Sequence, residues 1–139
     1  MTYPMTAAAS HVLALLLLAT PLAAHEYRTE SLTIDPPFTY VSDADTREGY
    51  LILVDDDGAG DRLLSVTGEA GAFLADAAGT PLAALEIPAG GAVELLPGGP
   101  HIRFPAPEAR WTEETEIAAT LLFERAGEVP VVFYVEPGE

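Results

Sequence analysis

Residues 116–135 read EIAATLLFERAGEVPVVFYV, and this stretch decides the fold class. Successive side chains of a β-strand point to opposite faces, so a half-buried strand has an apolar residue at every second position. Two runs follow this rule, and their apolar positions are Ile117, Ala119, Leu121, Phe123 and then Val129, Val131, Phe133, Val135. The turn residues Ala126-Gly127-Glu128 stand between them. The pattern predicts a β-hairpin of strands Glu116–Glu124 and Val129–Val135.

Turn residues recur every eight to twelve positions in the chain before this hairpin, which is the spacing of a β-sandwich or barrel. The runs between the turns predict further strands at Tyr27–Ile34, Gly49–Val54, Arg62–Thr67, Ala72–Leu74, Leu82–Ile87, Ala92–Leu96 and His101–Phe104. The polar stretch Phe38–Arg47 is expected to be a loop. No helical period is sustained beyond the N-terminal segment. We therefore expect an all-β Greek-key sandwich of about eight antiparallel strands.

The N-terminus predicts secretion. Val12–Ala19 is an unbroken apolar run, far shorter than the roughly 20 residues that span a bilayer. Thr20-Pro21 interrupts it, and Leu22-Ala23-Ala24 places small residues where signal peptidase cleaves. We expect residues 1–24 to be a cleaved signal peptide and 25–139 to be one domain. The segment departs from the usual signal-peptide pattern in that no Lys or Arg precedes the apolar run, and the alternative is an apolar anchor that is never cut.

Charge and sulfur content limit the partners. The chain has 22 acidic residues and six arginines, all after residue 25, and its net charge is −16. Such a charge argues against binding to nucleic acid or anionic lipid, and fits a basic partner or a cation. Cysteine is absent, and both methionines, Met1 and Met5, precede the expected cleavage site. The expected mature chain therefore contains no sulfur.

Several stretches together resemble one family. They are AHEYRTESLTID (24–35), GYLILV (49–54), DRLLSV (61–66), LEIPAGGAVELLPGGPHI (85–102) and ATLLFERAGEVPVV (119–132). They resemble the periplasmic copper chaperones called PCuAC, from about Ala24 to Val135. The resemblance implies a cupredoxin-like sandwich that hands Cu(I) to the Cu(A) centre of cytochrome oxidase.

The resemblance also implies a copper site of two histidines and two methionines, one pair of them in a His-x-Met motif. His101 stands at the histidine of that motif, whereas Arg103 stands where the methionine belongs. The second family histidine falls near Leu74-Ala75-Asp76, and the second methionine has no counterpart. An arginine cannot ligate a metal, and soft sulfur is the donor that suits Cu(I). The site is therefore expected to be degenerate, and His101 can equally serve a structural role at a strand end.

The residues alone suggest two other metal sites. Cleavage after Ala24 would expose His25, whose free amine and imidazole can chelate Cu(II), with Glu26 or His101 completing the site. The acidic run Asp55–Asp61 has the oxygen donors that Ca²⁺ takes, but it lacks the EF-hand pattern. A solvated hairpin turn is the better interpretation of that run.

The remaining polar and aromatic residues have ordinary interpretations. Arg103 is expected to pair with Glu86 or Glu94 across the sheet. Trp111 is expected to pack under the proline-rich loop 104–109. No set of residues resembles a catalytic centre, so we do not expect an enzyme.

The sequence thus predicts a periplasmic copper-binding chaperone with copper at His101 and His25. Its expected partners are cytochrome oxidase assembly factors or another envelope protein. The alternative is an interaction module that kept the sandwich, lost the ligands and uses its acidic surface to bind a basic partner.

Overall fold

The computed structural model describes residues 25–41, 46–68, 71–105 and 110–137, and the expected signal peptide lies outside them. These residues form strands and no helix, so none of them forms a helix that could cross a membrane. The strands are β1 (Tyr27–Arg28), β2 (Leu32–Ile34), β3 (Phe38–Tyr40), β4 (Thr46–Asp55), β5 (Asp61–Gly68), β6 (Phe73–Ala75), β7 (Leu85–Ile87), β8 (Ala92–Leu95), β9 (His101–Pro105), β10 (Glu116–Phe123) and β11 (Gly127–Glu136).

The hairpin at 116–135 is confirmed as β10 and β11. The two strands pair antiparallel from Glu116–Tyr134 to Phe123–Gly127. Positive φ at Gly127 allows the tight turn between them. The eight apolar positions of the alternating pattern include Leu121 and Phe133, both fully buried, so the inner face of the hairpin supplies much of the core.

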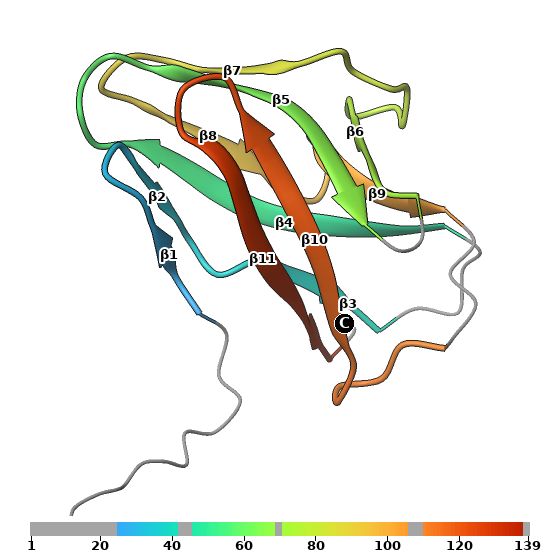
Figure 1. Cartoon of the computed structure of the whole chain (residues 1–139). Coiled ribbons are helices and arrows are strands. Elements are labelled where there is room, and N and C mark those ends of the chain that lie inside the picture. The colour runs from blue at the N-terminus through green and yellow to red at the C-terminus, as the bar shows by residue number, and fades with distance from the viewer. Residues whose placement is uncertain (1–24, 42–45, 69–70, 106–109, 138–139) are drawn as a thin grey trace, which may run out of the picture.

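The ten-residue strand β4 belongs to both layers of the sandwich. Its first half pairs with β3 and β9, and its second half pairs with β2 and β8. On the far side of β3 the sheet continues through β11, β10, β5 and β7. Figure 1 shows β10 and β11 crossing in front of β4 and β8, so the two layers face each other across the core.

The all-β sandwich is confirmed, and its strand details differ from the prediction in two ways. Eleven strands are found among the described residues instead of about eight. The pairing is also mixed, because β11 and β3 run parallel while the other pairs are antiparallel. The parallel pair forms because the chain leaves β2 at Asp35-Pro36-Pro37 and crosses to the other layer, where Tyr134 pairs with Phe38.

Three predicted boundaries were wrong, and one of them is the strand Leu82–Ile87, of which only Leu85–Ile87 forms β7. The single strand Tyr27–Ile34 is a hairpin of β1 and β2, because the Thr29 hydroxyl accepts hydrogen bonds from the backbone N–H groups of Ser31 and Leu32 and closes a turn. The expected loop Phe38–Arg47 contains β3 and the first residues of β4, and residues 42–45 lie outside the description.

The core is continuous between the layers and rich in aromatic rings. Phe104 packs edge-on against Phe133 and Trp111, with ring centroids 5.3 and 5.2 Å apart. Trp111 is buried, and the guanidinium of Arg47 stacks on it at 5.1 Å. Residues 106–109 of the proline-rich loop that was expected to cover it lie outside the described residues. Gly49 is required here, since a Cβ at this position would lie 2.7 Å from Phe104 Cε2.

Candidate metal centre

His101 opens strand β9 directly after the turn Pro97-Gly98-Gly99-Pro100. Gly98 has a φ of +90°, which a side chain would resist, and the Gly99 N–H donates to the Leu96 carbonyl at 3.0 Å. The turn delivers His101 onto the face of β9 opposite to the core residues Ile102 and Phe104. Even so, the side chain of His101 is only 3 % exposed.

The two ring nitrogens of His101 have different surroundings. Nδ1 lies 2.9 Å from the Gly99 carbonyl oxygen, to which it donates. Nε2 is buried and has no hydrogen-bond partner. A backbone carbonyl on Nδ1 leaves the lone pair on Nε2, which is the arrangement of many metal-ligating histidines. Nε2 is therefore the one nitrogen of His101 that is available to a ligand.

Glu48 stands beside His101 and Tyr50 beside Glu48, and the sequence interpretation missed both. The Glu48 carboxylate lies 3.5 Å from His101 Nδ1 and accepts a hydrogen bond of 3.1 Å from the Tyr50 hydroxyl. Burial, together with the adjacent charge of Glu48, raises the pKa of Tyr50 above its usual range. The pairing of β4 with β9 brings these residues together, so the only signal in the sequence was the alternation of Glu48 and Tyr50 around Gly49.

Arg103 occupies the outer face two residues after His101. Its cross-strand neighbours are Glu48 on β4 and Phe73 on β6. The guanidinium reaches instead over the β6–β7 turn, where a Cβ on Gly79 would overlap its Nη1. The expected pair of Arg103 with Glu86 or Glu94 is not found among the described residues, and Arg62 Nε donates to the Glu86 carboxylate at 2.8 Å. Arg103 thus places a permanent cation, and no donor for a metal, beside His101.

The strand opposite His101 contributes no ligand either. Ala75 of β6 is its direct cross-strand partner. Asp76 follows, but its carboxylate accepts hydrogen bonds of 2.9 Å from the N–H groups of Ala78 and Thr80 and shapes the turn. This side of the site is closed by a structural turn.

His25, the second predicted ligand, contacts Tyr134 of β11. Its ring is exposed and meets Tyr134 edge-on at 6.2 Å, while the neighbouring Glu26 pairs with Arg28 at 2.7 Å. No ring contact or hydrogen bond among the described residues joins His25 to His101. Within the described part of the chain, no group of three His, Asp or Glu side chains is arranged to hold a metal ion.

The acidic run Asp55–Asp61 forms the hairpin turn between β4 and β5, as preferred over a calcium loop. Two of its carboxylates are buried and not solvated. Asp55 accepts hydrogen bonds from the N–H groups of Gly60 at 3.0 Å and Gly90 at 2.7 Å. Asp61 accepts from the N–H groups of Arg125 at 2.8 Å and Ala126 at 3.0 Å.

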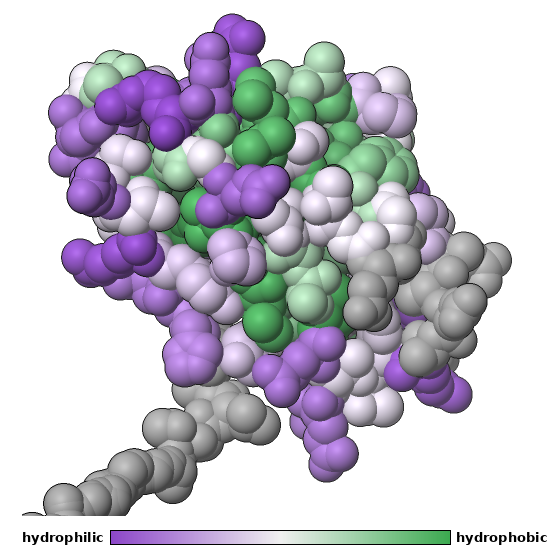
Figure 2. Space-filling model, in the orientation of Figure 1, coloured by the Kyte–Doolittle hydropathy of each residue, from purple (hydrophilic) through white to green (hydrophobic). Residues whose placement is uncertain are grey.

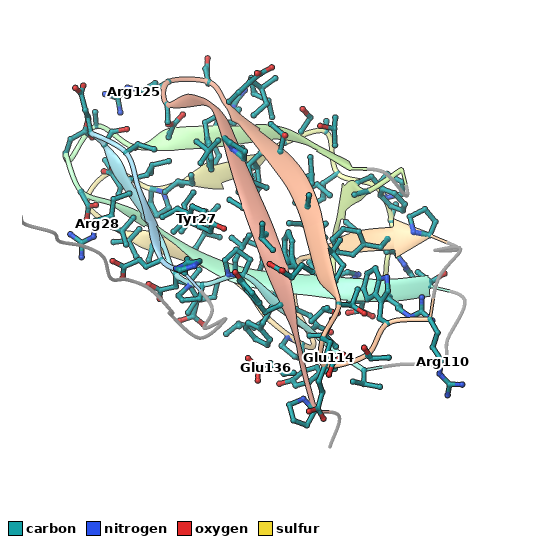
Figure 3. All side chains as sticks on the ribbon, turned by 60° about the horizontal axis from the view of Figure 1, so that its bottom comes forward. Tyr27, Arg28, Arg110, Glu114, Arg125 and Glu136 are labelled. Atoms are coloured by element: carbon teal, nitrogen blue, oxygen red, sulfur yellow. The ribbon has the colours of Figure 1, made fainter. Side chains whose placement is uncertain are left out.

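A cation already sits at this turn. The guanidinium of Arg125 binds the carboxylate of Asp57 at 2.8 Å and the carbonyl of Gly60 at 2.7 Å, from the tip of the β10–β11 hairpin (Figure 3). The guanidinium and the N–H of Ala59 hold the pKa of Asp57 well below its usual range. The carboxylates of this run therefore hold neighbouring turns together, and Arg125 supplies a positive charge beside them. We call this arrangement the structural clamp.

The described strands form a β-sandwich with a buried histidine directly after a Gly-Gly turn, which are the features that the resemblance to the PCuAC family implies. The chain belongs to the family described as "Putative lipoprotein LpqE-like", whose model matches residues 32–135. Among curated proteins, no sequence matches the chain.

Solved structures show the same fold. A copper-bound PCuAC domain from PmoF2 is 25 % identical, with a TM-score of 0.72 over 82 % of this chain and 99 % of that one. An apo PCuAC domain from PmoF1 is 21 % identical, with a TM-score of 0.74 over 82 % and 100 %. The Cu(I) form of DR1885 from Deinococcus radiodurans is 15 % identical, with a TM-score of 0.64 over 78 % and 79 %. The cupredoxin-like sandwich is thereby confirmed.

Proposed function

We propose that this protein binds copper outside the cytoplasm, in the manner of a copper chaperone. The proposed site has fewer ligands than the family site, and its donors are nitrogen atoms. The observation that carries the proposal is His101. It stands at the start of β9 in a fold shared with a copper-bound domain, and its Nε2 is buried without a partner. An unpaired polar atom at such depth is costly, and a bound metal would relieve that cost.

Copper is cargo in this proposal. The donors present fit it only in part, because His101 offers one imidazole and the chain after residue 5 offers no sulfur. Imidazole and amine nitrogens suit Cu(II) better than they replace the thioethers of a Cu(I) site. The proposal therefore includes His25 as a terminal chelator once residues 1–24 are removed, a location in the periplasm, and delivery toward the Cu(A) centre of cytochrome oxidase.

Titration of the secreted protein with Cu(I) and Cu(II) tests the proposal, after mass spectrometry has fixed its first residue. His101→Gln should weaken the binding of one ion at least tenfold, because glutamine offers no imidazole. His25→Gln separates a terminal Cu(II) site from the buried one. Binding weaker than micromolar for both ions in the unmodified protein would refute the function.

A second function is favoured by Arg103. A permanent cation beside His101, with Ala75 in place of a donor on the facing strand, would suit a module that binds a protein and no metal. This alternative gains support if copper leaves the thermal unfolding midpoint unchanged. It loses support if copper raises the midpoint and His101→Gln abolishes the rise.

A further inference from the structure

A shallow apolar groove crosses the outer face of the front layer, away from His101. It has a volume of about 640 Å³ and is lined by Thr67 and Gly68 of β5, Ala118–Thr120 of β10, Pro130–Val132 of β11, and Tyr27 of β1. Figure 2 shows apolar and weakly polar residues over much of the middle of this face, with one hydrophilic group among them and further hydrophilic residues at its left, upper and lower margins. None of the lining residues is charged, although the chain carries 22 acidic residues.

The register of the strands places small side chains on the floor and one ring on the wall. Thr120 lies between Thr67 and Pro130, and Ala118 lies opposite Val132. Tyr27 points from β1 toward β11 (Figure 3), and its hydroxyl accepts the Val132 N–H at 2.9 Å. The groove is thus held in shape by a hydrogen bond.

The same contacts exclude one mode of binding. Among the described residues, no strand pairs with the outer edge of β11 at Pro130 and Val132, since β3 pairs with Tyr134–Glu136. An open edge would accept a further strand through its N–H groups. Here Pro130 has none, and the N–H of Val132 is taken by Tyr27. A partner must therefore dock on the side chains of the face, and not by extending the sheet.

Carboxylates bracket the groove along the strands. Glu116 lies on the outer face of β10, two residues before Ala118. Glu128 lies on the outer face of β11, opposite Leu122, which is two residues after Thr120. Both carboxylates are exposed. Six residues separate the first row from the last, which is about 20 Å at 3.4 Å per residue. An apolar centre with acidic ends is complementary to a segment that has apolar residues between basic ones.

We propose that this groove docks a basic amphipathic segment of a partner protein, with apolar side chains over Ala118 and Thr120 and Lys or Arg near Glu116 and Glu128. A second copy of the chain is a poor occupant, because both copies would carry a charge of −16. The inference stands independently of copper, since it uses the layer opposite to His101.

A matched pair of variants tests the groove. Ala118→Lys puts a bulky cation on its floor, and Ala92→Lys makes the same change at an exposed alanine of β8, in the other layer. The probe is a synthetic peptide with Ala, Val and Leu between Lys pairs about 20 Å apart, and its Glu-for-Lys and Ser-for-apolar analogues are the controls. NMR amide shifts of the full chain report the site and the dissociation constant.

We expect the largest amide shifts at Ala118, Thr120 and Val132. The dissociation constant should be at least tenfold larger in Ala118→Lys, whereas in Ala92→Lys it should change less than twofold. The Ser analogue should also bind at least tenfold more weakly. Equal weakening by both variants would mean diffuse attraction to the net charge and would overturn the proposal. The proposal would also be overturned if the protein formed a dimer in sedimentation, or bound phosphatidylcholine or phosphatidylglycerol vesicles, and Ala118→Lys abolished that association.

Discussion

Replacement of Asp55 decides whether the acidic run is a structural clamp. Its buried carboxylate joins the β4–β5 turn to the turn before β8 through the N–H groups of Gly60 and Gly90. A hydrogen bond to a charged group contributes about 1.5–3 kcal/mol. Gly60 is buried and would keep an unsatisfied donor in Asp55→Ala, whereas Gly90 is exposed and would bind water. We therefore expect a loss of about 2–4 kcal/mol in the free energy of unfolding.

The asparagine variant separates charge from hydrogen bonding. One Asp55 oxygen is buried without a partner, so an amide NH₂ can take its place while the remaining oxygen still accepts. Asp55→Asn should cost only about 1 kcal/mol. Glu94→Ala, which removes an exposed carboxylate on β8, is the control and should change stability by less than about 0.5 kcal/mol.

Urea denaturation measures these differences, and thermal unfolding should show Asp55→Ala about 8–16 °C below the unmodified protein. Millimolar Ca²⁺ should not raise the unfolding midpoint, because Arg125 already supplies the positive charge at Asp57. If Asp55→Ala lies within 0.5 kcal/mol of the unmodified protein, or if Ca²⁺ stabilises the protein and Asp55→Ala removes the effect, the clamp is refuted and the calcium interpretation returns.

Three further predictions concern single residues. Arg103→Met replaces a cation beside His101 with a soft donor, and should strengthen Cu(I) binding at least tenfold in competition with a chromophoric chelator; unchanged affinity would count against a copper site at this face. The folded-state pKa of Tyr50 is raised, so its contribution to stability is complete below the unfolded pKa of about 10 and is lost as pH rises above it. Tyr50→Phe should therefore lose less stability than the unmodified protein between pH 9 and pH 11 in urea titrations, and an identical loss would contradict this. Gly49→Ala forces a methyl group against Phe104 and should cost about 1–3 kcal/mol by overpacking, which circular dichroism melts will show or exclude.

The sequence predicted those features that depend on local pattern. Period-two alternation at 116–135 identified the hairpin because each inward position must be apolar whichever strand it faces. The Gly-Gly turns placed His101 correctly at a strand start for the same local reason. Strands of two or three residues, such as β1 and β3, carry too few positions for alternation to show. The parallel pair of β3 with β11 depends on where the chain crosses between layers, which no local pattern records.

The candidate site was predictable only at His101. Glu48 and Tyr50 reach it through the pairing of β4 with β9, which joins residues more than 50 positions apart in the chain. The reach of Arg103 toward Gly79 likewise depends on the β6–β7 turn standing beside β9. The predicted partner Glu86 was lost because Arg62 stands directly opposite it on β5.

The two faces of β9 separate the core from the proposed copper site. On β9, Ile102 and Phe104 point into the core and are at most 1 % exposed, whereas His101 and Arg103 lie on the other face of the same strand. A substitution at position 103 therefore leaves the packing between the layers intact and alters only what stands beside His101. Fold similarity therefore reflects the residues of the inner face, whereas the proposed copper site depends on His101 and Arg103 of the outer face. The decisive evidence on copper is for this reason the behaviour of His101 and Arg103 variants, and not a closer structural match.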